Sequence, residues 1–428
     1  MTVRIYWFRN DLRLLDNQAF SRACRASSAL LPVYCHEPVT TTRWGFERSG
    51  PHRRHFLAAT LGDLTARLRE RGSDLFELAG RPAQVLPALA RAVGAQALAC
   101  EEIAAPEEQQ AVSALRAAGL PVETTWLSSL LDPATLPFPP ASLPEVFTAF
   151  RLAVERDGSR PPEPLPVPAR VPGLPALPEA ALRHRAPPGP VPKTIALADS
   201  SFPYALPSFA GGETAALSHL ERYLGRRLAH TYKSTRNELA GVDFSSKLSP
   251  WLASGALSAR TVYAALKGFE AQHGANDGTY WLWFELLFRD YFRFLHLKHG
   301  SRLYRARGLG EAAAPAHDAQ AFMQWAQGRT TAPLINAGMR ELAATGYLSN
   351  RMRQILASYL VYDLGGDFRA GAAWFESMLV DYDVYINQGN WLSIAGRGTD
   401  PRGGRRFNLR KQEAQYDPGG QYQARWGP

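Results

Sequence analysis

The chain has 428 residues, of which 46% are hydrophobic and 20% charged, a balance typical of a globular protein and a length sufficient for two domains. No apolar run approaches the roughly 18 residues that span a bilayer, and the opening MTVRIYWFRN lacks a signal-peptide core. We therefore expect a cytoplasmic protein. The three cysteines are odd in number and lack CxxC spacing, which predicts neither disulfides nor a metal site.

The formal net charge of +9 is unevenly placed, because residues 1–200 carry 22 basic and 20 acidic residues and residues 201–428 carry 26 and 19. A basic half rich in Trp and Tyr suits phosphate backbones and unpaired bases. The same charge fits a plain arginine-rich protein equally well. Charge alone therefore leaves both interpretations open.

The first 130 residues alternate strand-like and helical segments. Strands are expected at 3–8, 29–35, 74–78 and 97–100. Leucines at 57, 61, 64 and 68 mark one face of a helix that Gly72 ends, and further helices are expected through 85–93 and from about Pro106. This order predicts a parallel sheet with helices on both faces. No GxGxxG follows the first strand, which disfavours dinucleotide binding of the Rossmann type.

Seventeen of the 32 prolines lie between residues 132 and 192, in runs such as RPPEPLPVP and APPGPVP. We expect a semi-rigid connector over 132–205 that holds neither helix nor strand. From 206 onward the chain is expected to be helical, since the stretches 249–270, 279–299, 334–344 and 349–364 are amphipathic. The last dozen residues predict irregular structure.

Three segments of the helical half place polar groups inside apolar sequence. The first is FSSKLSPW, where Ser245, Ser246 and Ser249 surround Lys247 before a helix that starts with Pro. Hydroxyls, backbone N–H groups and a lysine suit a diphosphate. Taken alone, such a motif is more often a capped helix start.

The second segment, residues 280–300, carries Glu285 and Arg289 four residues apart among aromatic residues. An exposed pair of this kind contributes roughly a few tenths of a kcal/mol. Burial among the rings would instead require the carboxylate to be paired or functional.

The third segment, residues 379–400, places Asp381, Asp383 and Asn387 on a short irregular stretch before Trp391. Carboxylates and an amide suit either a metal or a ring system with N–H donors. The absence of nearby His and Cys disfavours a transition metal.

These segments belong to a longer series of motifs: RNDLRLLDN, GPHRRHFL, FTAFR, TYKSTRNEL, SSKLSPWLASGALS, WFELLFRDYFRF, GYLSNRMRQ and DYDVYINQGNW. In this order and spacing they resemble the photolyase and cryptochrome superfamily, and the DASH cryptochromes in particular, over nearly the whole chain. The resemblance implies an α/β antenna domain with a parallel five-stranded, Rossmann-like sheet over 1–131. It also implies the connector, and an all-α FAD-binding domain over 206–428.

By that resemblance, the residues that hold the FAD diphosphate and ribityl chain would be Tyr232, Ser245, Ser246, Lys247, Leu248 and Ser249. Those nearer the flavin ring would be Arg289, Asn350, Arg353, Asp381, Asp383 and Asn387, with Asn387 facing N5. A reduced anionic flavin favours a cation and N–H donors around it, which agrees with the residue types found.

The activity implied is light-driven repair of cyclobutane pyrimidine dimers, preferentially in single-stranded DNA, by an electron from reduced FAD. The lesion would be flipped into the cavity, which costs least in single strands. Glu285 would hydrogen-bond the dimer, and Asn350 would lie nearby. Looped-out duplex lesions and RNA stay open as partners, and a monomer is expected.

The resemblance also implies an antenna pigment, methenyltetrahydrofolate in the DASH group. Glu107 or Glu108 in APEEQQ would contact the folate, and the register is ambiguous. An acidic helix start is explained equally well by the helix dipole.

This chain departs from the family pattern along the photoreduction route. Trp391 fits the tryptophan next to the flavin and Trp325 the distal one at the surface, but Phe368 stands where the middle tryptophan is expected. Phenylalanine is hard to oxidise, so we expect an impaired route. Trp374 or one of four tyrosines, namely Tyr359, Tyr362, Tyr382 and Tyr385, could provide a detour.

The substrate cavity departs as well. Phe288 replaces a tryptophan, Ser393 replaces an aromatic residue, and Gln354 follows the DASH pattern. Losing a stacking partner removes about 1–3 kcal/mol per base, so duplex lesions should suffer most. Asn336 replaces an aspartate, an exchange that the sequence does not explain.

The rival hypothesis is a blue-light photoreceptor or regulatory nucleic-acid binder that keeps FAD and has lost efficient repair, favoured by Phe368 and Ser393. A flavin-free nucleotide-binding protein fits only the N-terminal half. Glu285 and Asn350 favour the enzyme.

Overall fold

The computed structural model describes every residue except 1, 187–198 and 428. Its N-terminal half contains one sheet of five parallel strands in the order β3-β2-β1-β4-β5. The strands are β1 (Val3–Trp7), β2 (Ala29–His36), β3 (Phe76–Ala79), β4 (Ala97–Glu102) and β5 (Val122–Trp126). The predicted fold class is confirmed, although the strand β5 has no counterpart among the segments expected from sequence pattern.

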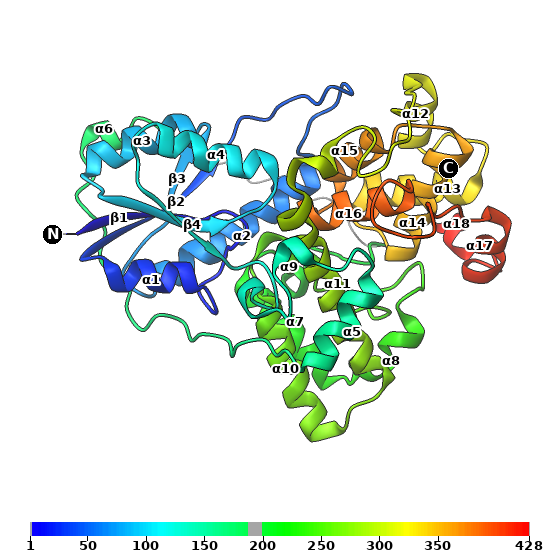
Figure 1. The fold of residues 1–428 in the computed structure, drawn as a ribbon, viewed down its shortest axis with the longest axis horizontal. Coiled ribbons are helices and arrows are strands. Elements are labelled where there is room, and N and C mark those ends of the chain that lie inside the picture. The colour runs from blue at the N-terminus through cyan, green and yellow to red at the C-terminus, as the bar shows by residue number, and fades with distance from the viewer. Residues whose placement is uncertain (1, 187–198, 428) are drawn as a thin grey trace.

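Helices cover both faces of this sheet (Figure 1). The helices α3 (Pro82–Val93) and α4 (Pro106–Ala117) pack on one face through Leu86 and Leu115. On the other face, α1 (Gln18–Ala26) and α2 (Pro51–Arg69) contribute Phe20 and Leu64. The leucine spacing along α2 therefore predicted its buried face correctly.

The connector is only partly as predicted. It contains the 3-10 turns η1 (Pro133–Thr135) and η2 (Pro140–Ser142), and the helices α5 (Phe147–Asp157) and α6 (Glu179–Leu182). The expectation of no helix is wrong for α5, because residues 145–160 hold no proline and Phe150 and Val154 are buried. The run APPGPVP lies largely outside the described residues.

The C-terminal half is helical, and all four amphipathic stretches form helices. After η3 (Pro207–Phe209), its elements are α7 (Glu213–Gly225), α8 (Leu228–Thr235), α9 (Ser249–Ser254), α10 (Ala259–His273), α11 (Asp277–His299), η4 (Gly300–Tyr304), α12 (Ala319–Ala326), α13 (Pro333–Thr345), α14 (Asn350–Ser358), the π-helical η5 (Tyr359–Asp363), α15 (Phe368–Met378), α16 (Val384–Ile394), α17 (Leu409–Tyr416) and α18 (Gln421–Arg425). The expectation of an irregular C-terminus is wrong, because Tyr422 of α18 is buried against α13.

The helix α11 is the centre of this half and packs against α8, α16, α5 and α10 (Figure 1). Its start is fixed by a capping box in which Asn276 and Thr279 satisfy each other's backbone N–H groups. Among the helices formed by the described residues, none has both the length and the apolar composition that a membrane crossing requires.

The two halves are held together by side chains that bind backbone groups. Asp290 on α11 accepts hydrogen bonds from the backbone N–H groups of Leu130 and Leu131, each at 2.8 Å. Tyr385 on α16 accepts one from Ala104 at 2.7 Å. Because these bonds satisfy backbone groups that follow the sheet, they fix the position of α11 and α16 relative to it.

Candidate functional site

Five segments of the helical half supply the predicted flavin contacts. They are α8, the loop 244–249, α11, the start of α14, and the loop 379–383 with α16. The helices α8 and α16 both pack on α11, and α14 packs on α16. Tyr232 and Asn387, which are 155 residues apart in the sequence, thus lie on two helices that both pack on α11.

The loop before α9 contains a buried lysine. Lys247 is 2% exposed, and its Nζ lies 3.3 Å from the ring centroid of Phe244 and 4.9 Å from that of Tyr347. Within the part of the chain that the structure describes, Nζ has no hydrogen-bond partner. Burial holds the pKa of Lys247 well below its usual value. An anionic group placed there would relieve this cost.

The serines of this loop do not cap a helix. The helix α9 is preceded by Leu248, no side chain caps its first turn, and Ser249 is exposed. The Ser246 carbonyl is instead held by Nε2 of His219 at 2.9 Å. Ser245 and Ser246 are half-buried. The alternative interpretation as a capped helix start is therefore wrong.

Glu285 is paired across helices rather than along its own. Its Oε1 accepts a hydrogen bond from Nη1 of Arg236, which follows α8, at 2.7 Å, and its side chain remains 33% exposed. Burial raises the pKa of Glu285, and the Arg236 charge opposes this. The carboxylate lies among rings, with Trp281 and Phe284 stacked at 4.8 Å and 20°.

Arg289 does not pair with Glu285, which corrects the i,i+4 ion pair considered from the sequence. Its guanidinium points to the domain junction, where it donates to the carbonyl oxygens of Ser128 and of Leu252, the latter at 3.0 Å. Burial lowers the pKa of Arg289 to about 9. Its Nε has no partner among the described residues.

In the acidic segment before Trp391, Asp381 and Asp383 lie on an irregular stretch as expected, whereas Asn387 lies in α16 and not on that stretch. Asp383 caps α16 by accepting from the backbone N–H groups of Tyr385 and Ile386. Its other oxygen pairs with Arg293 of α11. Burial opposes ionisation, but the Arg293 and Arg289 charges hold the pKa of Asp383 below its usual value. Asn387 lies one turn into the helix and donates from Nδ2 to the Ala372 carbonyl at 3.0 Å.

Asp381 keeps one oxygen available. Its Oδ2 accepts from Arg353 of α14 at 2.8 Å, while Oδ1 is buried and unpartnered within the described residues. Such an acceptor suits a ligand N–H or hydroxyl. Together with the unpartnered Nζ of Lys247, this oxygen shows that the residues present fit FAD, which has an anionic diphosphate and N–H and hydroxyl donors.

The remaining predicted residues lie at the edge of this region. Asn350 is the exposed first residue of α14, Gln354 is half-buried one turn later, and Ser393 is half-buried on α16. Phe288 packs edge-on against Phe147 at 4.5 Å. Tyr232 of α8 is half-buried, and the Glu285 charge contributes to a strongly raised pKa of its phenol after burial itself.

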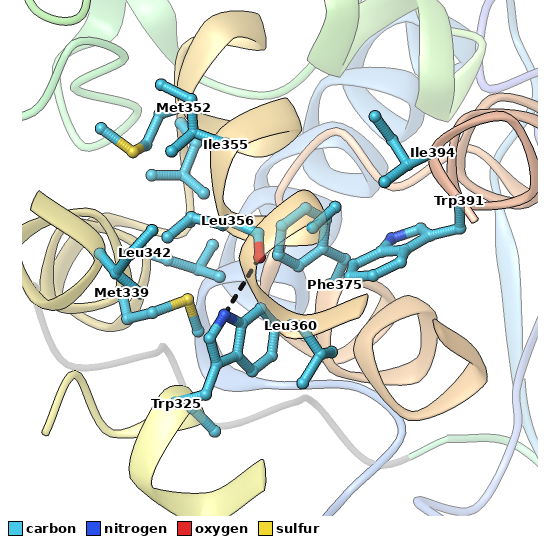
Figure 2. Packing of buried hydrophobic residues seen from close by; sticks show 14 of the residues in the cluster. Trp325, Met339, Leu342, Met352, Ile355, Leu356, Leu360, Phe375, Trp391 and Ile394 are labelled. Carbon is cyan, nitrogen blue, oxygen red and sulfur yellow. Dashed lines mark hydrogen bonds between the residues drawn. The ribbon is translucent and has the colours of Figure 1, made fainter. Parts of the chain in front are cut away.

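The predicted arrangement of the tryptophans needs correction. Trp391 is buried, and Trp325 is fully buried too and therefore cannot be the surface end of a route. Figure 2 shows Trp325 near Trp391, and their ring centroids are 6.4 Å apart. Phe368 is also buried, with the Arg397 guanidinium 5.8 Å above its ring. Trp374 is half-buried.

The two candidate antenna residues differ in their surroundings. Glu107 is exposed and pairs with Arg48 at 2.5 Å. Glu108 is half-buried, and burial raises the pKa of its carboxyl. Of the two carboxyl groups, that of Glu108 is the more shielded from solvent.

Asn336 has a structural explanation that the sequence did not provide. Its Oδ1 accepts from the backbone N–H of Thr330 at 2.7 Å, and its Nδ2 donates to the Thr330 carbonyl at 2.8 Å. An aspartate could not make the second bond. The amide thus ties the turn before α13 to the helix.

Sequence reasoning missed the partners of the site carboxylates. Arg236 and Arg293 lie within TYKSTRNEL and WFELLFRDYFRF but were assigned no role, and Glu341 was not considered. Glu341 is buried, accepts from the Tyr422 hydroxyl, and has its pKa raised to about 7 by burial. The signal available in the sequence was that each of these two motifs contains an arginine. Such a cation can pair with a carboxylate of the site, as Arg236 does with Glu285 and Arg293 does with Asp383.

Comparison with known proteins agrees with this geometry. The DNA photolyase family model matches residues 4–169, and the model of the FAD binding domain of DNA photolyase matches residues 281–428. The cryptochrome DASH of Gloeobacter violaceus is 43% identical and spans 99% of this chain and 85% of the relative. The cryptochrome DASH of Xenopus laevis is also 43% identical, and the match covers 100% of this chain and 82% of the relative. A crystal structure of a Synechocystis cryptochrome superposes with a TM-score of 0.93 at 39% identity. The match covers 100% of this chain and 88% of the Synechocystis chain.

The parallel sheet, the helical half and the FAD-binding match define a flavoprotein of the photolyase type. Within that class, the chain belongs to the cryptochrome DASH family, since it is similar to DASH relatives over nearly its whole length.

Proposed function

We propose that the protein repairs cyclobutane pyrimidine dimers in single-stranded DNA, using light and reduced FAD. When bound, the reduced flavin supplies the electron that splits the dimer. The protein supplies the cavity, holds the lesion and balances its charge. The observation that carries the proposal is Glu285, a half-buried carboxyl with a raised pKa that lies among rings on the central helix.

The surroundings of Glu285 support its role toward the dimer. The hydrogen bond from Arg236 holds Oε1 of Glu285 in place. It therefore also fixes the orientation of the second carboxyl oxygen, Oε2. A carboxyl of raised pKa shares a proton more readily with a carbonyl that gains negative charge. Glu285 would therefore hydrogen-bond the pyrimidine carbonyl groups and stabilise the extra electron.

The rim beside Glu285 supports binding of unpaired bases. Trp281 and Phe284 form a stacked pair. Lys233 and Arg236 lie over the Trp281 ring, with Nζ and Cζ at 5.1 and 5.0 Å from its centroid. Stacking surfaces next to cations are the usual means of holding single strands. Phe288 and Ser393 offer less ring surface than a tryptophan would, which favours lesions that are already unstacked.

Residues of the five segments would hold the cofactor. The Lys247 ammonium would meet the diphosphate, and the free oxygen of Asp381 would accept from an N–H or hydroxyl donor. Asn387 would face N5 with the amide oxygen that its bond to Ala372 leaves available. Arg353 holds Asp381 in place for this contact.

We further propose that a methenyltetrahydrofolate antenna contacts Glu108 rather than Glu107. The half-buried carboxyl of Glu108 would accept from the pterin N–H groups, whereas Glu107 is already paired with Arg48. Reconstitution with the folate should fail in Glu108→Ala and proceed in Glu107→Ala. The reverse result would exchange the two assignments.

The function is tested with the FAD-loaded protein, a reductant, light and a single-stranded oligonucleotide that contains one thymine dimer. Loss of the dimer in light and not in darkness is expected, with slower loss from a duplex of the same sequence. A protein that binds FAD and the oligonucleotide but leaves the dimer intact would overturn the proposal. The same assay on a dimer-containing RNA decides whether repair requires deoxyribose.

The second candidate is a photoreceptor or regulatory nucleic-acid binder with little repair activity. It is favoured by Phe288, whose ring packs edge-on against Phe147 and Phe292 and so presents less free surface to a base. Flavin photochemistry without dimer loss, in a protein that still binds single strands, would establish this alternative.

A further inference from the structure

The aromatic core of the helical half brings two tryptophans into direct contact. The ring centroids of Trp391 and Trp325 are 6.4 Å apart, with their planes at 79°. Phe375 packs on both, 5.1 Å from Trp391 and 6.3 Å from Trp325 (Figure 2). Gly371 makes room for this packing, because a Cβ there would lie 2.2 Å from Cη2 of Trp391. An electron can therefore pass between the two indoles without Phe368.

The surroundings of Trp325 favour its oxidised form. Its Nε1–H donates to the carbonyl oxygen of Leu356 at 3.2 Å, as Figure 2 shows. An oxidised indole carries positive charge and a more acidic N–H, so this bond strengthens when Trp325 loses an electron. Trp325 is 0% exposed, however, and cannot be reduced by a molecule in solution. A further carrier must connect it to the surface.

Trp374 is in the right place for that role. Phe322 lies 5.7 Å from Trp325 and 6.3 Å from Trp374, so one ring separates the two indoles. Trp374 is half-buried on α15, and Phe46 packs edge-on against it at 4.9 Å. It is thus close to Trp325 and still reached by solvent.

Three of the competing exits, Trp44, Tyr382 and Tyr385, carry a cation over the ring. The Arg43 guanidinium lies 4.2 Å from the ring centroid of Trp44, which disfavours a positive charge on that indole. Arg53 lies 4.5 Å from the Tyr382 ring and Arg293 lies 4.8 Å from the Tyr385 ring. Burial also raises the pKa of both phenols, and oxidised tyrosine needs to lose its proton.

We propose that photoreduction of this protein runs from Trp374 through Trp325 to Trp391, with Phe368 off the route. Trp391 would give one electron to the photoexcited oxidised flavin when FAD is bound. Trp391 regains it from Trp325, and Trp325 regains it from Trp374. Trp374 releases its N–H proton to solvent and recovers an electron and a proton from a thiol in solution, whose S–H bond breaks to leave a thiyl radical. The route rests on flavin binding and not on dimer repair, so failure of repair leaves it intact.

The test follows flavin absorbance under blue light with a thiol, together with flash detection of tryptophan radicals. Trp325→Phe should slow photoreduction by about tenfold or more, because oxidising phenylalanine raises the barrier by well over one kcal/mol. Trp374→Phe should leave the first radical but shorten its lifetime and remove its reaction with the thiol. Reduction by dithionite in darkness should be unchanged in both, which separates a broken route from lost flavin.

Two variants serve as matched controls. Trp44→Phe removes a nearby half-buried indole and should photoreduce like the parent. Phe368→Trp should give no gain, in contrast to the acceleration expected if the route passed through that position. Normal photoreduction in Trp325→Phe, or a marked gain in Phe368→Trp, would overturn the route. Slowing in Trp44→Phe but not in Trp374→Phe would overturn the assignment of the exit.

Discussion

Glu285 shows how one residue is tuned by two opposing effects. Burial raises its pKa, and Arg236 holds one of its oxygens at 2.7 Å. Glu285→Gln keeps the shape and removes the charge and the shared proton. A charge-assisted hydrogen bond contributes about 1.5–3 kcal/mol, so dimer repair should slow by about ten- to a hundredfold. Repair kinetics of the FAD-loaded variant, on the single-stranded dimer at saturating substrate, measure this.

Glu270→Gln is the matched control for that substitution, because Glu270 is also a partly buried carboxyl that pairs with a cation, Lys267 of α10, and it is not among the predicted site residues. It should repair at the parent rate. Unchanged repair in Glu285→Gln, with unchanged FAD content, would remove Glu285 from the active site.

Glu341 makes folding stability depend on pH. Burial raises its pKa from an ordinary 4.5 to about 7, so the folded protein binds this proton more tightly than the unfolded chain. At a pH below the pKa that Glu341 has in the unfolded chain, its carboxyl is protonated in both the folded and the unfolded state. It then has no effect on the pH dependence of the free energy of unfolding. As pH rises toward 7 the unfolded chain ionises first, and stability falls by up to about 3 kcal/mol.

Glu341→Gln removes this titration and still accepts from the Tyr422 hydroxyl. The variant should gain stability relative to the parent between pH 5 and pH 8. Thermal unfolding of both proteins across that range measures the difference. Parallel curves would show that Glu341 is ionised in the folded protein throughout.

At the scale of elements, the sequence pattern predicts helices and strands where apolar residues recur at the spacing that places them on one buried face. Leucine spacing located α2, and the amphipathic stretches located α10, α11, α13 and α14. It missed α5, because proline density around residues 132–192 hid a proline-free stretch. It missed the helical nature of α16, because Asp383 acts as a helix cap rather than as a loop residue. Local spacing cannot show which of these roles a polar residue takes.

Helix contacts also depend on single glycines. A Cβ at Gly389 of α16 would lie 2.1 Å from Cδ1 of Phe292 on α11, and Phe292 is buried. Gly389→Ala should therefore push the two helices apart and cost about 1–3 kcal/mol. Because Asp383 caps this helix and Asn387 lies on it, FAD should be retained less tightly. Chemical unfolding and FAD fluorescence titration measure the two effects.

Gly268→Ala provides the comparison, since Gly268 lies in α10 and a Cβ there meets no atom within 4 Å. It should stabilise the protein by about 0.5–1 kcal/mol. A loss in Gly268→Ala as large as that in Gly389→Ala would show that backbone effects, and not the contact with Phe292, explain the result.

At the scale of the whole molecule, the sequence proposes residues for the site but does not specify their partners. Sequence motifs identified Glu285, Asp381 and Asp383. The ion pairs Arg236–Glu285 and Arg293–Asp383 join residues 49 and 90 positions apart, and no local pattern specifies them. The contact between Trp391 and Trp325 depends in the same way on how α12, α15 and α16 pack. Tertiary packing therefore decides which route an electron can take.

The junction of the two halves is the last place where one residue acts on the whole molecule. Asp290 is 0% exposed and accepts from two consecutive backbone N–H groups with its two oxygens. Asp290→Asn would turn one acceptor into a donor that faces an N–H group. A buried clash of this kind costs about 2–5 kcal/mol, and it weakens the bonds that hold α11 against the sheet domain.

The two halves should then unfold separately, giving two calorimetric transitions where the parent gives one. Asp277→Asn on the exposed first turn of α11 should lose under about 1 kcal/mol and keep one transition, because its pair with Lys233 is exposed. A single transition at the parent temperature in Asp290→Asn would mean that the halves are coupled through other contacts, such as the bond between Tyr385 and Ala104.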